Sequence, residues 1–124
     1  MKTVLFITWG CFGQEDMLQT FYKHGFKIAT FPLKDRGYPK DKEKYAVDLK
    51  KNLRESKCDF VFSFNFFPII AQACKDENCK YVSWIYDSPY SNMLYPEALY
   101  ETNYIFTFDS YMCNFLSNQG AKTI

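Results

Sequence analysis

The chain has 124 residues, 48% of them hydrophobic and 20% aromatic, and its 15 basic and 14 acidic side chains leave a formal net charge of +1. That length fits one domain, and the apolar content excludes a disordered chain. The near-neutral charge provides no basic field for nucleic acid or anionic lipid. The most apolar window, residues 60–74, contains Asn65, Pro68 and Gln72 and is shorter than the ~20 residues of a membrane span. We therefore expect no membrane span.

The cysteines are five in number, which is odd, and none shows C-x-x-C spacing. They fit neither a disulfide framework nor a zinc site. We expect reduced thiols that pack as small hydrophobic groups in a cytoplasmic protein. We also expect no bound metal and no cofactor.

Short apolar runs alternate with helical stretches in the first half of the chain. Continuous apolar runs predict strands at residues 3–8 (TVLFIT), 26–31 (FKIATF) and 59–64 (DFVFSF). Apolar residues at helical spacing predict helices at 15–23 and 45–57, the second of them after a charged loop at 34–44.

The same alternation continues in the second half. It predicts helices at 68–77, near 96–101 and at 111–118, and strands at 80–85 and 104–108. Pro68 favours a helix start, and Asp109 or Ser110 can cap the last helix. Residues 121–124 begin like a sixth strand. We therefore expect a single Rossmann-like domain over 1–124 that is a fragment of a longer two-domain protein, the alternative being an ordinary C-terminus with a short edge strand.

Strands that are apolar throughout are buried on both faces, and helices lie between them along the chain. This pattern predicts an α/β fold with a parallel sheet of five or six strands and helices on both faces. We expect the strand order 3-2-1-4-5 with a partial sixth strand, the flavodoxin-like order 2-1-3-4-5 being the alternative. The first strand should lie in the interior of the sheet.

Ligands of open α/β sheets bind beyond the carboxyl ends of the strands. After the first strand come Gly10, Cys11, Phe12 and Gly13. They match neither a dinucleotide fingerprint nor a phosphate loop, and plain turn chemistry is the competing interpretation. Cys11 lies near a helix N-terminus, but the only His is elsewhere in the chain, so a nucleophilic role lacks a general base.

Polar side chains also follow the third and fourth strands. Asn65 interrupts an aromatic run, and a buried amide needs hydrogen-bond partners from the backbone or from a ligand. Asp87 and Ser88 follow the fourth strand, where a carboxylate can accept hydrogen bonds from a polyol or form an Asx turn before Pro89. Asp109 is predicted to be a helix cap. We expect Gly10, Gly13, Asn65, Asp87 and Ser88 to converge at one end of the sheet. The catalytic residues are unknown at this stage.

Four stretches carry a resemblance to a family: 13–27 (GQEDML to HGFK), 58–68 (CDFVFSFNFFP), 81–89 (YVSWIYDSP) and 106–121 (FTFDS to LSNQGA). The chain resembles the N-terminal domain of bacterial glycosyltransferase-like proteins related to the spore-maturation glycosyltransferases. The resemblance implies a two-domain enzyme of GT-B architecture, in which this domain holds the sugar or glycan acceptor. A missing C-terminal domain would bind the nucleotide-sugar donor, and Asn65 and Asp87 would line the cleft.

The isolated chain is not expected to transfer sugar, because half of the implied cleft is absent. The alternative is a non-enzymatic α/β domain that binds a ligand or a protein. A phosphate-receiver variant is disfavoured, because Trp9, Gly10 and Asn65 occupy the positions where it needs carboxylates. An incomplete sixth strand leaves an unpaired edge, and a face that should meet the missing domain stays uncovered, so we expect weak self-association.

Overall fold

The computed structural model describes residues 1–34, 39–85 and 95–123. Five strands form one sheet: β1 (Thr3–Thr8), β2 (Lys27–Pro32), β3 (Phe60–Phe64), β4 (Lys80–Ile85) and β5 (Asn103–Thr107). The helices are α1 (Gln14–Lys23), α2 (Lys42–Ser56), α3 (Pro68–Asp76), the short 3-10 helix η3 (Pro96–Leu99) and α4 (Ser110–Asn118). The predicted α/β class is confirmed.

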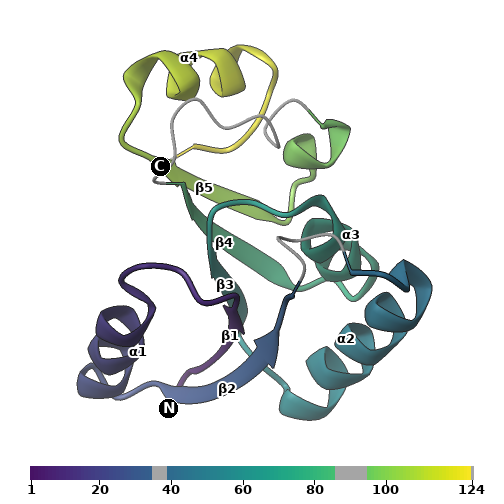
Figure 1. The fold of residues 1–124 in the computed structure, drawn as a ribbon. Helices are drawn as coiled ribbons and strands as arrows, with labels where there is room; N and C mark the ends of the chain where they lie inside the picture. The colour runs from purple at the N-terminus through teal and green to yellow at the C-terminus, as the bar shows by residue number, and fades with distance from the viewer. Residues whose placement is uncertain (35–38, 86–94, 124) are drawn as a thin grey trace.

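The strands are all parallel, and their order is β2-β1-β3-β4-β5 (Figure 1). The expected order 3-2-1-4-5 is therefore wrong, and the flavodoxin-like alternative is correct. β1 pairs with β2 on one side and with β3 on the other, so it is an interior strand as predicted. A sequence in which every strand is apolar on both faces does not distinguish these two orders, because both bury β1 equally.

Local chemistry sets the helix ends. Asp41 accepts a hydrogen bond from the backbone N–H of Lys44 at 3.0 Å, and this cap starts α2 three residues before the predicted position, inside the expected loop. Asp109 caps α4 by accepting from the N–H groups of Tyr111 and Met112 at 2.9 and 3.3 Å, as predicted.

One face of the sheet is covered by α2, α3, η3 and α4. Their apolar side chains form a continuous core with Leu5, Ile7, Val61, Ile85 and Ile105 from the strands, all of them fully buried. On the opposite face, α1 packs over β1 and β2 through a second cluster built around Val4, Phe6 and Phe62. Figure 1 shows α1 on one side of the sheet and the α2–α3 pair on the other, so helices lie on both faces as predicted.

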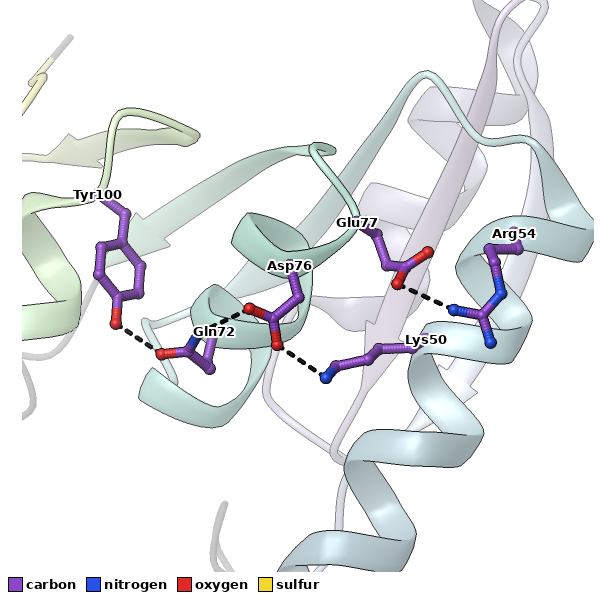
Figure 2. Close-up of polar contacts among 6 residues, drawn as sticks. All are labelled: Lys50, Arg54, Gln72, Asp76, Glu77 and Tyr100. Carbon is purple, nitrogen blue, oxygen red and sulfur yellow. Dashed lines mark hydrogen bonds and ion pairs between the residues drawn. The ribbon is translucent and has the colours of Figure 1, made fainter.

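Ion pairs join the solvent side of α2 to that of α3. Lys50 Nζ lies 2.7 Å from a carboxylate oxygen of Asp76, and Arg54 donates to Glu77 at 2.9 Å (Figure 2). These pairs connect the C-terminal half of α2 with the C-terminal end of α3 at the protein surface.

The far edge of the sheet carries the start of another strand. Thr123 forms a parallel bridge with Ile105 of β5, and the Ile105 N–H donates to the carbonyl of Lys122 at 3.1 Å. Residues 122–123 thus lie beside β5, where the sequence predicts the sixth strand to begin.

Candidate functional site at the carboxyl end of the sheet

The turn after β1 is closed by a side chain of the following helix. Gly10 and Gly13 both have positive φ, 79° and 85°, which glycine adopts without strain. The amide oxygen of Gln14 accepts from the N–H groups of Trp9 and Gly10 at 3.1 and 3.2 Å. The result is an open hollow of about 610 Å³ lined by residues 10–16.

Hydrogen bonds connect this turn to the ends of the neighbouring strands. The indole N–H of Trp9 donates to the carbonyl of Phe64 at 2.9 Å, and the backbone N–H of Asn65 donates to the carbonyl of Trp84 at 2.7 Å. The carboxyl ends of β1, β3 and β4 therefore meet at one edge of the sheet. Gly10, Gly13 and Asn65 lie at this edge, while Asp87 and Ser88 lie outside the described residues.

Asn65 occupies a tight, buried turn. Its φ is 61°, in the left-handed region that Asn tolerates better than most residues, and it is 3% exposed. The Ser63 hydroxyl donates to the carbonyl of Asn65 at 2.7 Å. The structure thus places Asn65 in a buried turn at the carboxyl edge of the sheet, and contact with an acceptor stays a prediction.

A buried tyrosine organises the same turn. The Tyr81 hydroxyl lies 2.6 Å from the Ser63 hydroxyl and accepts from the backbone N–H of Phe67 at 3.3 Å. Since Ser63 donates to Asn65, Tyr81 donates to Ser63 in a consistent chain of hydrogen bonds. Burial raises the pKa of Tyr81 well above that of a free tyrosine, so the phenol stays protonated.

The hollow combines an exposed ring with carboxylates. Phe12 is 94% exposed at its rim. Glu15 and Asp16 lie in the first turn of α1, where their charge complements the helix dipole. Two carboxylates at a helix start repel a phosphate, but their oxygens accept hydrogen bonds from hydroxyl groups.

Cys11 is half-buried in the same hollow, with its Sγ 4.0 Å from the amide oxygen of Gln14.

In the described ranges 1–34, 39–85 and 95–123, no group of three or more His, Cys, Asp or Glu side chains is arranged to hold a metal. Within the same ranges, no helix combines the length and the apolar character that crossing a membrane requires.

Sequence reasoning missed two features of this region. The first is the role of Gln14 and Tyr81 as builders of the turns. A signal for Gln14 existed, because a Gln at the start of a helix that follows a glycine turn can reach back to free N–H groups. No comparable pattern points to Tyr81, whose partners come from β3.

The second is a groove on the sheet face beside α1. It measures about 470 Å³ and runs over β3, β4 and β5; its walls are Met17, Phe21, Phe60, Phe62, Lys80, Val82, Trp84, Tyr104 and Phe106. Trp84 is 44% exposed there. An apolar strand pattern predicts burial of both faces of β4, and for Trp84 this prediction is wrong, because α1 packs over β1, β2 and part of β3 and leaves the Trp84 ring open.

No protein-family model and no curated protein matches the chain. Among solved structures, it is similar to the crystal structure of ureidoglycine-glyoxylate aminotransferase from Bacillus subtilis, with a TM-score of 0.49 and 16% sequence identity. The match covers 67% of this chain and 22% of that chain, so the present chain spans about a fifth of that enzyme's length. A similarity at this level bears on no functional question.

Proposed function

We propose that the chain is the acceptor-side domain of a glycosyltransferase of GT-B architecture, working in the cytoplasm. The resemblance of four sequence stretches and the parallel α/β sheet support this proposal. The observation that carries it is the hollow at residues 10–16, where an exposed aromatic ring stands beside two carboxylates at the carboxyl edge of the sheet.

That combination suits a sugar better than a nucleotide. The C–H face of a pyranose packs on an exposed ring such as Phe12, while its hydroxyls donate to carboxylate oxygens of Glu15 and Asp16. A nucleotide diphosphate instead needs cations, and the carboxylates of Glu15 and Asp16 repel its charge even at this helix N-terminus. In the proposal the donor therefore binds to another domain, and Asn65 and Asp87 line the acceptor side of the cleft.

Sugar binding can be measured on the chain itself. We expect millimolar concentrations of glucose, galactose or N-acetylglucosamine to shift the backbone amide NMR signals of residues 10–16. Phe12→Ala should weaken the binding at least threefold, whereas Tyr22→Ala, which removes another exposed ring from α1, should leave it unchanged. If no saccharide in such a panel shifts these signals, or if both variants weaken binding equally, the acceptor assignment fails.

The enzymatic half of the proposal has its own test. A nucleotide-sugar donor should not be hydrolysed by the isolated chain, because the proposal places the donor site elsewhere. Reading the gene beyond Ile124 decides whether such a domain exists. A second βαβ domain with a sugar-nucleotide motif supports the transferase, and a stop codon contradicts it.

A second candidate is an α/β domain that binds a protein through the groove beside α1. The observation that favours it is the contiguous apolar lining of that groove, since monomeric proteins seldom leave large aromatic patches open. A second copy of the chain is the simplest partner. Light scattering should then show weak association at high concentration, abolished by Trp84→Ser and retained by Tyr22→Ser. A strictly monomeric wild type removes this candidate partner.

A further inference from the structure

Two cysteines meet at the opposite end of the sheet from the hollow. Cys58 lies two residues before β3, and Cys79 directly precedes β4. Their Sγ atoms lie 3.7 Å apart, and both side chains are half-buried. Each follows a residue with positive φ, Lys57 at 50° and Asn78 at 52°, so two tight turns bring the thiols face to face.

The backbone places them within reach of a covalent bond. β3 and β4 are neighbours with Phe60 opposite Lys80, which puts Cys58 and Cys79 one residue apart diagonally across the pair. A strand spacing of about 4.8 Å and a rise of about 3.3 Å give a Cα separation of about 6 Å, within the range of disulfides. The sulfurs, 3.7 Å apart, must approach by less than 2 Å to reach the bond length of a disulfide, about 2.05 Å.

Solvent reaches this pair. A hollow of about 230 Å³ is bordered by both cysteines and by the charged side chains of Arg54, Asp59, Glu77 and Lys80. The third nearby thiol, Cys74, is fully buried in the core, and burial raises its pKa, which keeps it protonated and unreactive. The site therefore consists of two accessible thiols beside an inert one.

The thiols also differ in acidity. A hydrogen bond with the Cys79 thiol lowers the pKa of Cys58 to about 7, against the opposing effect of partial burial. The same hydrogen bond and partial burial raise the pKa of Cys79. Near neutral pH a substantial fraction of Cys58 is thus a thiolate with a protonated thiol next to it.

We propose that Cys58 and Cys79 are an oxidisable dithiol, which hydrogen peroxide or another hydroperoxide converts to a disulfide linking the entries of β3 and β4. The Cys58 thiolate attacks one peroxide oxygen, the O–O bond breaks, and hydroxide leaves, giving a sulfenic acid at Cys58. Cys79 then attacks that sulfur, the S–O bond breaks, and the departing hydroxide takes the Cys79 proton as water. The thiols lose two electrons and the peroxide gains them.

The test uses the 124-residue chain, first reduced and then treated with hydrogen peroxide. Trypsin should release peptide 58–75 joined to peptide 76–80, with a mass about 2 Da below the sum of the two reduced peptides. Because Cys74 lies in the same peptide as Cys58, fragmentation must assign the linkage. Cys113→Ser, which removes a half-buried thiol on α4, is the matched control and should leave the linkage intact.

Removing the second thiol should trap the intermediate. In Cys79→Ser, dimedone should label Cys58 after peroxide treatment, and circular dichroism checks that this variant is folded. Alkylation of Cys58 by iodoacetamide in wild type should rise about tenfold between pH 6 and pH 8, because the thiolate fraction increases through a pKa of about 7. Peroxide oxidation of Cys11 or Cys113 while Cys58 and Cys79 stay reduced would overturn the proposal, as would a linkage through Cys74.

Discussion

The two faces of the sheet are built from the same strands but end in different surroundings. On the face under α2 and α3, strand residues such as Val61 and Ile85 are fully buried among aliphatic side chains. On the other face, α1 lies over β1 and β2 (Figure 1). The groove lies over β3 to β5 on that same face. An apolar strand pattern thus predicts an apolar sheet face. It does not predict that one of the described helices covers that face.

The side chains of the two faces also differ in kind. The open side is aromatic: Phe62 packs against Phe6, Phe21 and Phe64 with ring centroids 5.2 to 5.4 Å apart, and Trp84 lies 6.3 Å from Phe106. Rings in tilted and edge-to-face contact attract one another, so this aromatic packing continues from the cluster under α1 to the margin of the groove. This explains how the open face keeps its shape beside a groove.

The largest expected effect is a difference in the free energy of unfolding between two valine substitutions in adjacent strands. Val61→Ala removes two buried carbons from the covered face and should lower the free energy of unfolding by about 2 to 3 kcal/mol. Val82→Ala changes the groove in the same way and should cost about 1 kcal/mol or less, because Val82 is only partly buried. Urea denaturation measures both, and equal losses would mean that the groove is covered in solution.

A smaller effect is expected from the polar chain inside the covered face. Tyr81→Phe leaves the Phe67 N–H and one hydrogen-bonding site on Ser63 without their partner, which should cost about 1 to 3 kcal/mol. Tyr100→Phe is the matched control. It removes one hydrogen bond, 2.6 Å long, between a phenol and Gln72 at the protein surface, and should change stability by about 0.5 kcal/mol at most.

Thermal unfolding would show directly which of the two variants, Tyr81→Phe or Tyr100→Phe, loses more stability. If Tyr100→Phe lowered the melting temperature more than Tyr81→Phe, the hydrogen bonds of Tyr81 with Ser63 and Phe67 would not be the ones that stabilise the turn at Asn65. Tyr81→Phe should also shift the backbone amide NMR signals of residues 65–67 more than those of α1.

The smallest effect concerns the solvent side of the covered face. A hydrogen bond from Lys50, with help from Gln72, lowers the pKa of Asp76 below its ordinary value of 3.8 (Figure 2). The native state therefore gains stability from the ionised form above that value, and loses it as the pH falls through the lower, native pKa. Asp76→Asn should cost only about 0.2 to 1 kcal/mol at pH 7, since the pair is exposed.

Both pH and salt check this assignment. The difference between wild type and Asp76→Asn should shrink below pH 3.8 and should also shrink in 1 M NaCl, where exposed charges are screened. A difference that stays constant from pH 7 to pH 2 would assign the effect to the Gln72 hydrogen bond instead.

Sequence reasoning predicts the parallel sheet and its helices because each strand is a continuous apolar run and each helix has its own spacing. It also predicts the cap at Asp109, which depends only on neighbouring residues. The strand order was beyond it, since TVLFIT suits any interior position. The early start of α2 at Lys42 depends on Asp41, a cap hidden within a charged stretch.

The candidate site is also predictable in part, because the bounds of the strands determine which residues follow them. The rule for strand ends places Gly10, Gly13 and Asn65 at one edge, and hydrogen bonds from Trp9 and to Trp84 show that edge. The turn at Asn65 is hydrogen-bonded through Ser63 to Tyr81, which is distant in sequence and carries no local signal. The Cys58–Cys79 contact likewise depends on which strands are neighbours, so it follows only once the order is known.

The interior position of β1 has a consequence for synthesis of the chain. One side of β1 pairs with β2 early, but the other side pairs with β3, and Val4 meets Phe60 only after α2 has been made. At roughly 5 to 20 residues per second, the ribosome takes a few seconds to add the segment from Pro32 to Phe60. Throughout that interval the nascent chain carries an apolar strand with one unsatisfied backbone edge, the form in which polypeptides recruit chaperones or aggregate.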